Sequence, residues 1–205
     1  MMSEIREDIK SEINKIRIVD AHDHTMTEAD RNEYAVDFSY LFLLSNCCDL
    51  VSAGMPPRLM EAFRLPVRRC WVEFNNRMRT GFYIPPPERD DMSLAERWQA
   101  FEPYWEAMRN TSYAKQTLRA VRDIFGTEDL NRDTYVQLSQ AIADSRRPGW
   151  YHHVMKEKAR IDVVLLDLQN TNVDKELFAP LMELDAFIQV KSRVELMELE
   201  EDKDE

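Results

Sequence analysis

Glycine is scarce in this sequence, and its scarcity excludes several kinds of site. The chain has four glycines in 205 residues and contains no Gly-rich phosphate loop, GxSxG nucleophile elbow or Walker motif, so a phosphate-cradling loop is not expected. The three cysteines include an adjacent pair, Cys47 and Cys48, which matches neither a disulfide framework nor a zinc CxxC spacing. This use of cysteine favours the reducing cytoplasm as the location.

Long apolar segments and a basic surface are also missing. The longest apolar run, YLFLL at residues 40–44, is far shorter than a membrane span, and the charged N-terminus lacks the apolar core of a signal peptide. The net charge is −11, of which residues 195–205, with seven acidic residues and one lysine, carry −6. Nucleic acid is disfavoured because its phosphates require a basic face. We therefore predict neither a nucleic-acid nor a membrane partner, with homo-oligomerisation left open.

Apolar periodicity predicts a mainly helical chain that contains a few strands. Ile5, Ile9 and Ile13 recur at every fourth residue, which is typical of an amphipathic helix over residues 3–15. Further helices are predicted at 36–53, 93–108, 111–126, 131–144 and 150–158. Ser93 and Glu96 form a capping box for the second of these, and Pro103 is expected to kink or break it. Strands are predicted at 16–22 and 160–170, and residues 176–187 hold a candidate third.

Two of the four histidines stand two residues apart at the end of the first predicted strand, in IRIVDAHDHT at residues 16–25. Regular alternation places Asp20, His22 and His24 on one side of that strand, with i and i+2 about 6.6 Å apart. Two neutral imidazoles at this spacing can bind one divalent ion, but a catalytic metal needs further ligands and a water. The pair is half a site at most. Alternatively, both imidazoles are hydrogen-bonded in a polar turn and bind nothing.

The stretch VDAHDHT resembles the first-strand signature of the amidohydrolase superfamily, whose members are metal-dependent (β/α)8 barrels with an HxH at the end of strand 1. A leading helix, this strand, a long helical insertion and the strand ARIDVVLLD follow each other as in uronate isomerases and their amidohydrolase-like relatives. The resemblance implies an α/β fold, an incomplete (β/α)8 TIM barrel containing the first two or three strands. The barrel domain would cover residues 1–205, with the helical insertion at 25–158. Polymerase-and-histidinol-phosphatase proteins and TatD-like nucleases begin similarly, but the large insertion favours the uronate-isomerase-like branch.

The resemblance also implies a function. A divalent metal, expected to be zinc, would be held by His22 and His24 and would activate water to attack a small-molecule substrate. One alternative is a uronate-isomerase-like aldose–ketose isomerase of sugar acids, and another is a non-catalytic helix-rich module that works by association. The family's further metal ligands and its aspartate general base are expected beyond Glu205, so the catalytic residues are unknown and this chain alone is expected to be inactive.

Two aspartates are secondary candidates for the site. Asp20 is a candidate to orient His22 by a carboxylate–imidazole hydrogen bond, or simply to cap the loop. Asp167 falls near the C-terminal end of the later strand, where it would either reach the mouth of the site or cap a turn. The other two histidines, His152 and His153, lie about 100° apart on a predicted α-helix and are not expected to face one ion.

Overall fold

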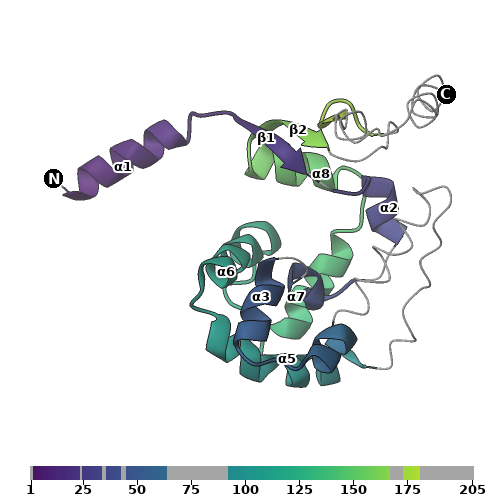
Figure 1. Ribbon diagram of the computed structural model, residues 1–205. Helices are drawn as coiled ribbons and strands as arrows, with labels where there is room; N and C mark the ends of the chain where they lie inside the picture. Colours follow the sequence, from purple (N-terminus) through teal and green to yellow (C-terminus); the bar gives the residue numbers. More distant parts are fainter. Residues whose placement is uncertain are drawn as a thin grey trace, which may run out of the picture. The chain divides into compact units, whose positions relative to one another are not determined.

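The computed structural model describes residues 2–23, 25–33, 36–42, 45–63, 92–166 and 173–180. The chain divides into two compact units, one formed by Met1–Thr25 with Ile161–Glu205 and the other by Met26–Arg160. Most of their elements are labelled in Figure 1. In the ranges given, no helix combines the length and the apolar character needed to cross a membrane.

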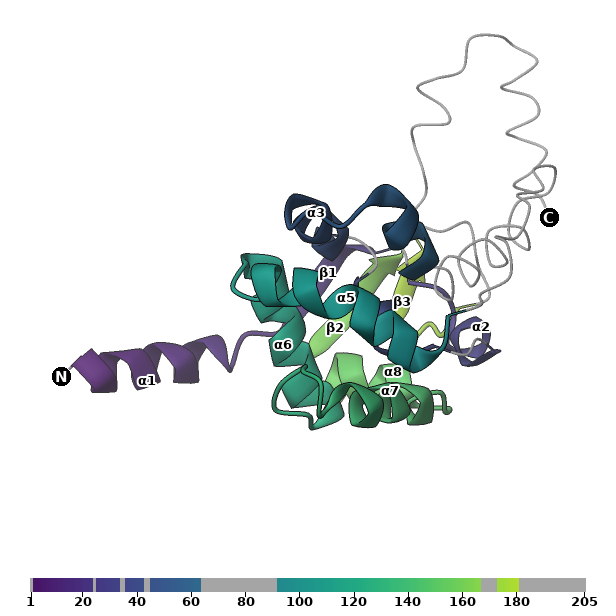
Figure 2. The same ribbon diagram turned by 90° about the horizontal axis from the view of Figure 1, so that it is seen from below.

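The first unit contains one helix and a small parallel sheet. Helix α1 (Met2–Ile13) leads to strand β1 (Ile18–Asp23), which pairs with β2 (Ile161–Leu166), and β2 pairs with β3 (Phe178–Pro180). The strand order is β1-β2-β3, and Figure 2 shows the three strands side by side. Helix α1, strand β1 and residues 161–166 of the second predicted strand are confirmed. Residues 167–170 and 181–187 of the predicted strands lie outside the described residues, within which β3 spans three residues of the candidate third.

The prediction of an incomplete (β/α)8 barrel is wrong: the described chain is mostly helical, with a small three-stranded parallel sheet. Barrel strands are packed inside and covered by helices outside, and are therefore buried on both faces. Four of the six residues of β1 are exposed.

The second unit is helical. Its elements are α2 (Glu28–Glu33), the 3-10 helix η1 (Phe38–Phe42), α3 (Ser45–Ser52), a helical stretch at 57–63, α5 (Leu94–Met108), α6 (Ser112–Phe125), α7 (Tyr135–Asp144), α8 (Trp150–His152) and the π-helix η2 (His153–Lys158).

The single buried helix predicted at 36–53 is wrong, because η1 ends before α3 begins. Two side chains of α3 take carbonyl groups of η1 as hydrogen-bond acceptors: Asn46 Nδ2 donates to Leu41 O at 2.9 Å, and the Cys47 thiol donates to Phe42 O at 2.9 Å. These bonds satisfy carbonyl groups that a continuous α-helix would have used itself.

Aromatic residues form the core of the helical unit. The rings of Phe63 and Phe101 stack 5.0 Å apart, and Phe42 lies 4.6 Å from Phe101. Trp105 is fully buried, and its indole N–H donates to Leu130 O at 2.8 Å. This packing lies on both sides of Pro103, and α5 runs without a break through the proline.

Candidate functional site

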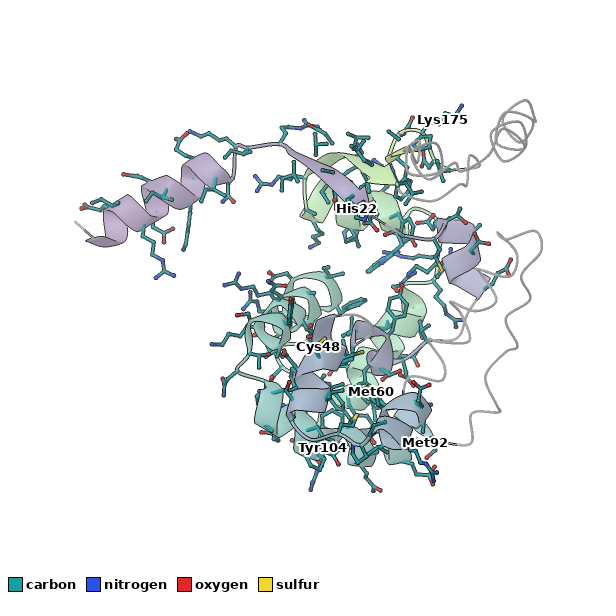
Figure 3. All side chains as sticks on the ribbon, viewed as in Figure 1. His22, Cys48, Met60, Met92, Tyr104 and Lys175 are labelled. Atoms are coloured by element: carbon teal, nitrogen blue, oxygen red, sulfur yellow. The ribbon has the colours of Figure 1, made fainter. Side chains whose placement is uncertain are left out.

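The candidate site lies where β1 ends. Because β1 and β2 are parallel, with Asp23 opposite Leu166, both strands end at the same edge of the sheet. In open α/β sheets the carboxyl ends of the strands are the usual place for ligands. His22, labelled in Figure 3, is one residue from this end of β1, and it is exposed.

The register of β1 is irregular just at this end. Between Asp20 and Asp23 the strand advances three residues, whereas β2 advances two, from Val164 to Leu166. One extra residue in a strand is the arrangement of a β-bulge, which redirects side chains and is frequent beside active sites. The half-buried positions of β1 are Asp20 and Asp23, three residues apart. The strict alternation that predicts a shared face for Asp20 and His22 is therefore interrupted between them.

Two carboxylates organise the backbone around the histidines. Asp20 Oδ1 accepts a hydrogen bond from the backbone N–H of His22 at 3.3 Å. Asp23 Oδ1 accepts two hydrogen bonds from Thr25, one from the backbone N–H at 2.7 Å and one from the hydroxyl at 2.5 Å. Aspartate commonly bonds the backbone two residues later in such turns. Sequence reasoning missed Asp23, although the Asp-x-Thr spacing in DHT is a signal for this turn.

The structure provides only part of a ligand set. His24 directly follows Asp23 in the sequence and Asp167 directly follows Leu166, and both lie outside the described residues. In the part of the chain that is described, no group of three or more His, Cys, Asp or Glu side chains is placed to hold a metal ion. The exposed imidazole of His22 fits a metal as one ligand, which is fewer than the three protein ligands of a typical catalytic zinc.

The other two histidines approach one carboxylate in the helical unit. His153 Nδ1 lies 2.7 Å from Glu157 Oε2, and His152 Nδ1 lies 3.7 Å from Glu157 Oε1. The hydrogen bond with His153 is the main cause that lowers the pKa of Glu157 below its ordinary value. Residues 153–158 form a π-helix, in which residues five apart in sequence come together. Glu157 is therefore within reach of both histidines, which a regular α-helix would place about 100° apart.

A shallow pocket of about 290 Å³ lies nearby in the same unit. Its lining residues are Ile124, Phe125, Ala141, Asp144, Ser145, Arg147 and Trp150. The Arg147 guanidinium lies over the Trp150 ring at 5.6 Å, and Phe125 stacks on that ring at 5.9 Å. The pocket is at the lower limit of the volumes of small-molecule sites, about 300 to 1,000 Å³. Its chemistry is an aromatic wall beside one cation and one carboxylate.

Comparisons with known proteins add no relative to this description. No protein-family model matches the chain, and no curated protein and no solved structure matches it. The chemistry of the site is therefore argued from its own residues.

Proposed function

We propose that this chain contributes two imidazole ligands, His22 and His24, to the divalent-metal site of a hydrolase that acts on a small molecule. The observation that carries the proposal is the position of His22, which is exposed at the carboxyl edge of a parallel sheet. The likeness of VDAHDHT to the amidohydrolase first-strand signature adds to it. Zinc is the expected ion, because neutral imidazole nitrogen is one of its principal ligands.

The residues of this chain would divide the work as follows. His22 and His24 would hold the ion as neutral imidazoles. Asp20 accepts a hydrogen bond from the backbone N–H of His22. Asp23 accepts hydrogen bonds from Thr25, which follows His24. These bonds hold the backbone in place on both sides of the two ligands. A bound zinc ion supplies a water whose pKa is lowered to about 7. The remaining ligands and the general base would come from outside the described residues.

Zinc affinity tests this assignment directly. We would titrate zinc into the full chain against a chromophoric chelator, and compare His22→Ala and His24→Ala with a matched control, His152→Ala. The control also removes one exposed imidazole, but from the helical unit. Loss of either ligand should weaken zinc binding about tenfold or more, since even residues that only support a metal ligand contribute that much. Equal affinities in all three variants would refute the proposal.

Two alternatives lead to different assays. An aldose–ketose isomerase of sugar acids would use the same two histidines, and the completed metal site would then interconvert sugar acids instead of hydrolysing esters or amides. A non-catalytic module that works by association is favoured by the exposed isoleucines of α1. The cytoplasm, inferred from the cysteines, is the compartment we propose in each case.

A further inference from the structure

Helix α1 carries an uncovered row of isoleucines. Ile5, Ile9 and Ile13 are 54%, 55% and 56% exposed, and they lie one above another because residues four apart share a face of an α-helix. Figure 1 shows this helix as the first element of the chain, ahead of β1. A continuous apolar row on a soluble surface indicates a contact with another molecule.

The charges beside this row are sorted by sign. The residue before each isoleucine is acidic, and the residue after each of the first two isoleucines is basic. The acidic flank is formed by Glu4, Asp8 and Glu12, and the basic flank by Arg6 and Lys10. Successive residues are about 100° apart around a helix, so the two rows border the isoleucines on opposite sides. All five of these residues are exposed. Lys10 also contacts Glu7 at 2.8 Å, an exposed pair of the kind that contributes little.

Symmetry determines which partner such a helix fits. When two copies pack in parallel about a twofold axis, the acidic flank of each copy faces the basic flank of the other on both sides of the contact. In an antiparallel pair, acidic would face acidic and basic would face basic. Flanking charges of this kind set partner choice and orientation in paired helices. The pattern is therefore complementary to a second, parallel copy of itself.

We propose that α1 is a homodimerisation surface, in which the α1 helices of two copies pack in parallel through Ile5, Ile9 and Ile13. The contact is short, because twelve residues extend about 18 Å. Isolated helices of this length are marginal in water, so the dimer should be weak and should form as the protein concentration rises. The proposal does not depend on the metal site, and it can be tested in the presence of a chelator.

The first test is the mass of the full chain in sedimentation equilibrium over a range of concentrations. The wild-type protein should shift from 24.3 kDa toward twice that mass. Ile9→Lys places a charge in the middle of the row and should raise the dissociation constant about tenfold or more. Val136→Lys is the matched control, since Val136 of α7 is 54% exposed and lies in the other unit, and it should leave dimerisation unchanged.

The second test exchanges the charges. The triple variant Glu4→Lys/Asp8→Lys/Glu12→Lys has two basic flanks, and Arg6→Glu/Lys10→Glu has two acidic flanks. Each variant alone should be monomeric, because like charges would meet on both sides of the contact. An equimolar mixture should dimerise again. This rescue also excludes unfolding of α1 as the reason for the loss, and circular dichroism checks the helix in each variant.

Three results would overturn the proposal. The first is a wild-type chain that stays monomeric at every concentration. This outcome would include a monomeric chain that binds lipid vesicles through Ile9. The second is a dimer that persists unchanged in Ile9→Lys. The third is a dimer that persists in either charge variant alone, because a parallel α1 pair could not tolerate it.

Discussion

Phe101 is the residue whose truncation should destabilise the helical unit most. Its side chain is fully buried, and aromatic rings surround it on several sides. The distances from its ring centre are 4.6 Å to Phe42, 5.0 Å to Phe63, 5.5 Å to Phe38, 5.7 Å to Trp98 and 5.7 Å to Trp105. Alanine at this position would leave a cavity with large, rigid walls. Such walls collapse poorly onto a void, because protein interiors are closely packed.

The expected loss follows from these contacts. Replacing a buried phenylalanine by alanine typically costs about 3 to 5 kcal/mol, and each aromatic pair contributes about 0.5 to 1.5 kcal/mol beyond the buried area. With five ring neighbours, Phe101→Ala should lie at the upper end, at about 4 to 5 kcal/mol. A domain has about 5 to 15 kcal/mol of stability in total. The variant should therefore lose a large part of the stability of this unit.

Urea unfolding monitored by far-ultraviolet circular dichroism would measure this loss. The midpoint should fall while the slope stays constant, because the surface exposed on unfolding is nearly the same. Phe125→Ala is the control: Phe125 is half-buried and stacks on Trp150 alone among the ring pairs described, so it should lose only about 1 to 2 kcal/mol. A loss below about 2 kcal/mol for Phe101→Ala, or one equal to the control, would refute the reasoning.

Two further predictions concern charged groups. Asp37→Asn removes the negative charge paired with Arg97, whose Nε lies 2.9 Å from Asp37 Oδ2 with side chains 6% and 17% exposed, and should cost about 3 kcal/mol in urea unfolding. On the same helix as Arg97, Glu102→Gln weakens an ion pair with Arg132, whose side chain is 76% exposed, and should cost less than about 1 kcal/mol. Similar losses in the two variants would contradict the argument. Because its folded-state pKa is lowered, Glu157 stabilises the fold above the ordinary glutamate pKa, and that stabilisation disappears as pH falls through the lowered value. In NMR titrations, His153→Ala should raise the pKa of Glu157 toward the ordinary value, and an unchanged pKa would contradict the assigned hydrogen bond.

Features that depend on neighbouring residues were predictable from the sequence. The capping box of α5 forms as predicted, with Ser93 N–H donating to Glu96 Oε2 at 2.8 Å and Glu96 N–H donating to Ser93 Oγ at 3.3 Å. Helix α6 ends at Gly126, whose φ of 67° is costly for any residue with a Cβ. Both signals use groups within a few residues of each other, so no distant part of the chain is needed to form them.

Features that depend on backbone irregularity were not predictable. His152 and His153 both approach Glu157 because residues 153–158 form a π-helix. No local pattern in the sequence predicts this π-helix. At the candidate metal site, regular alternation predicted that Asp20 and His22 share one face of the strand. In the structure, β1 has one extra residue opposite β2, and this extra residue interrupts the alternation. Register is a property of two strands together, and these strands are separated by more than 130 residues of sequence.

By itself, the sequence determined helix α1 with its apolar row and sorted charges, the positions of β1 and β2, the capped start of α5 and the end of α6, because each of these is a matter of spacing along a few turns. It did not determine the separate helices η1 and α3 within 36–53. Only the tertiary structure decided that the sheet is small and β1 largely exposed, that Phe101 lies at the centre of the core, and that His22 stands at an irregular strand end. The physical reason is that burial and register depend on residues far apart in the chain, whose contacts form only when the whole unit packs.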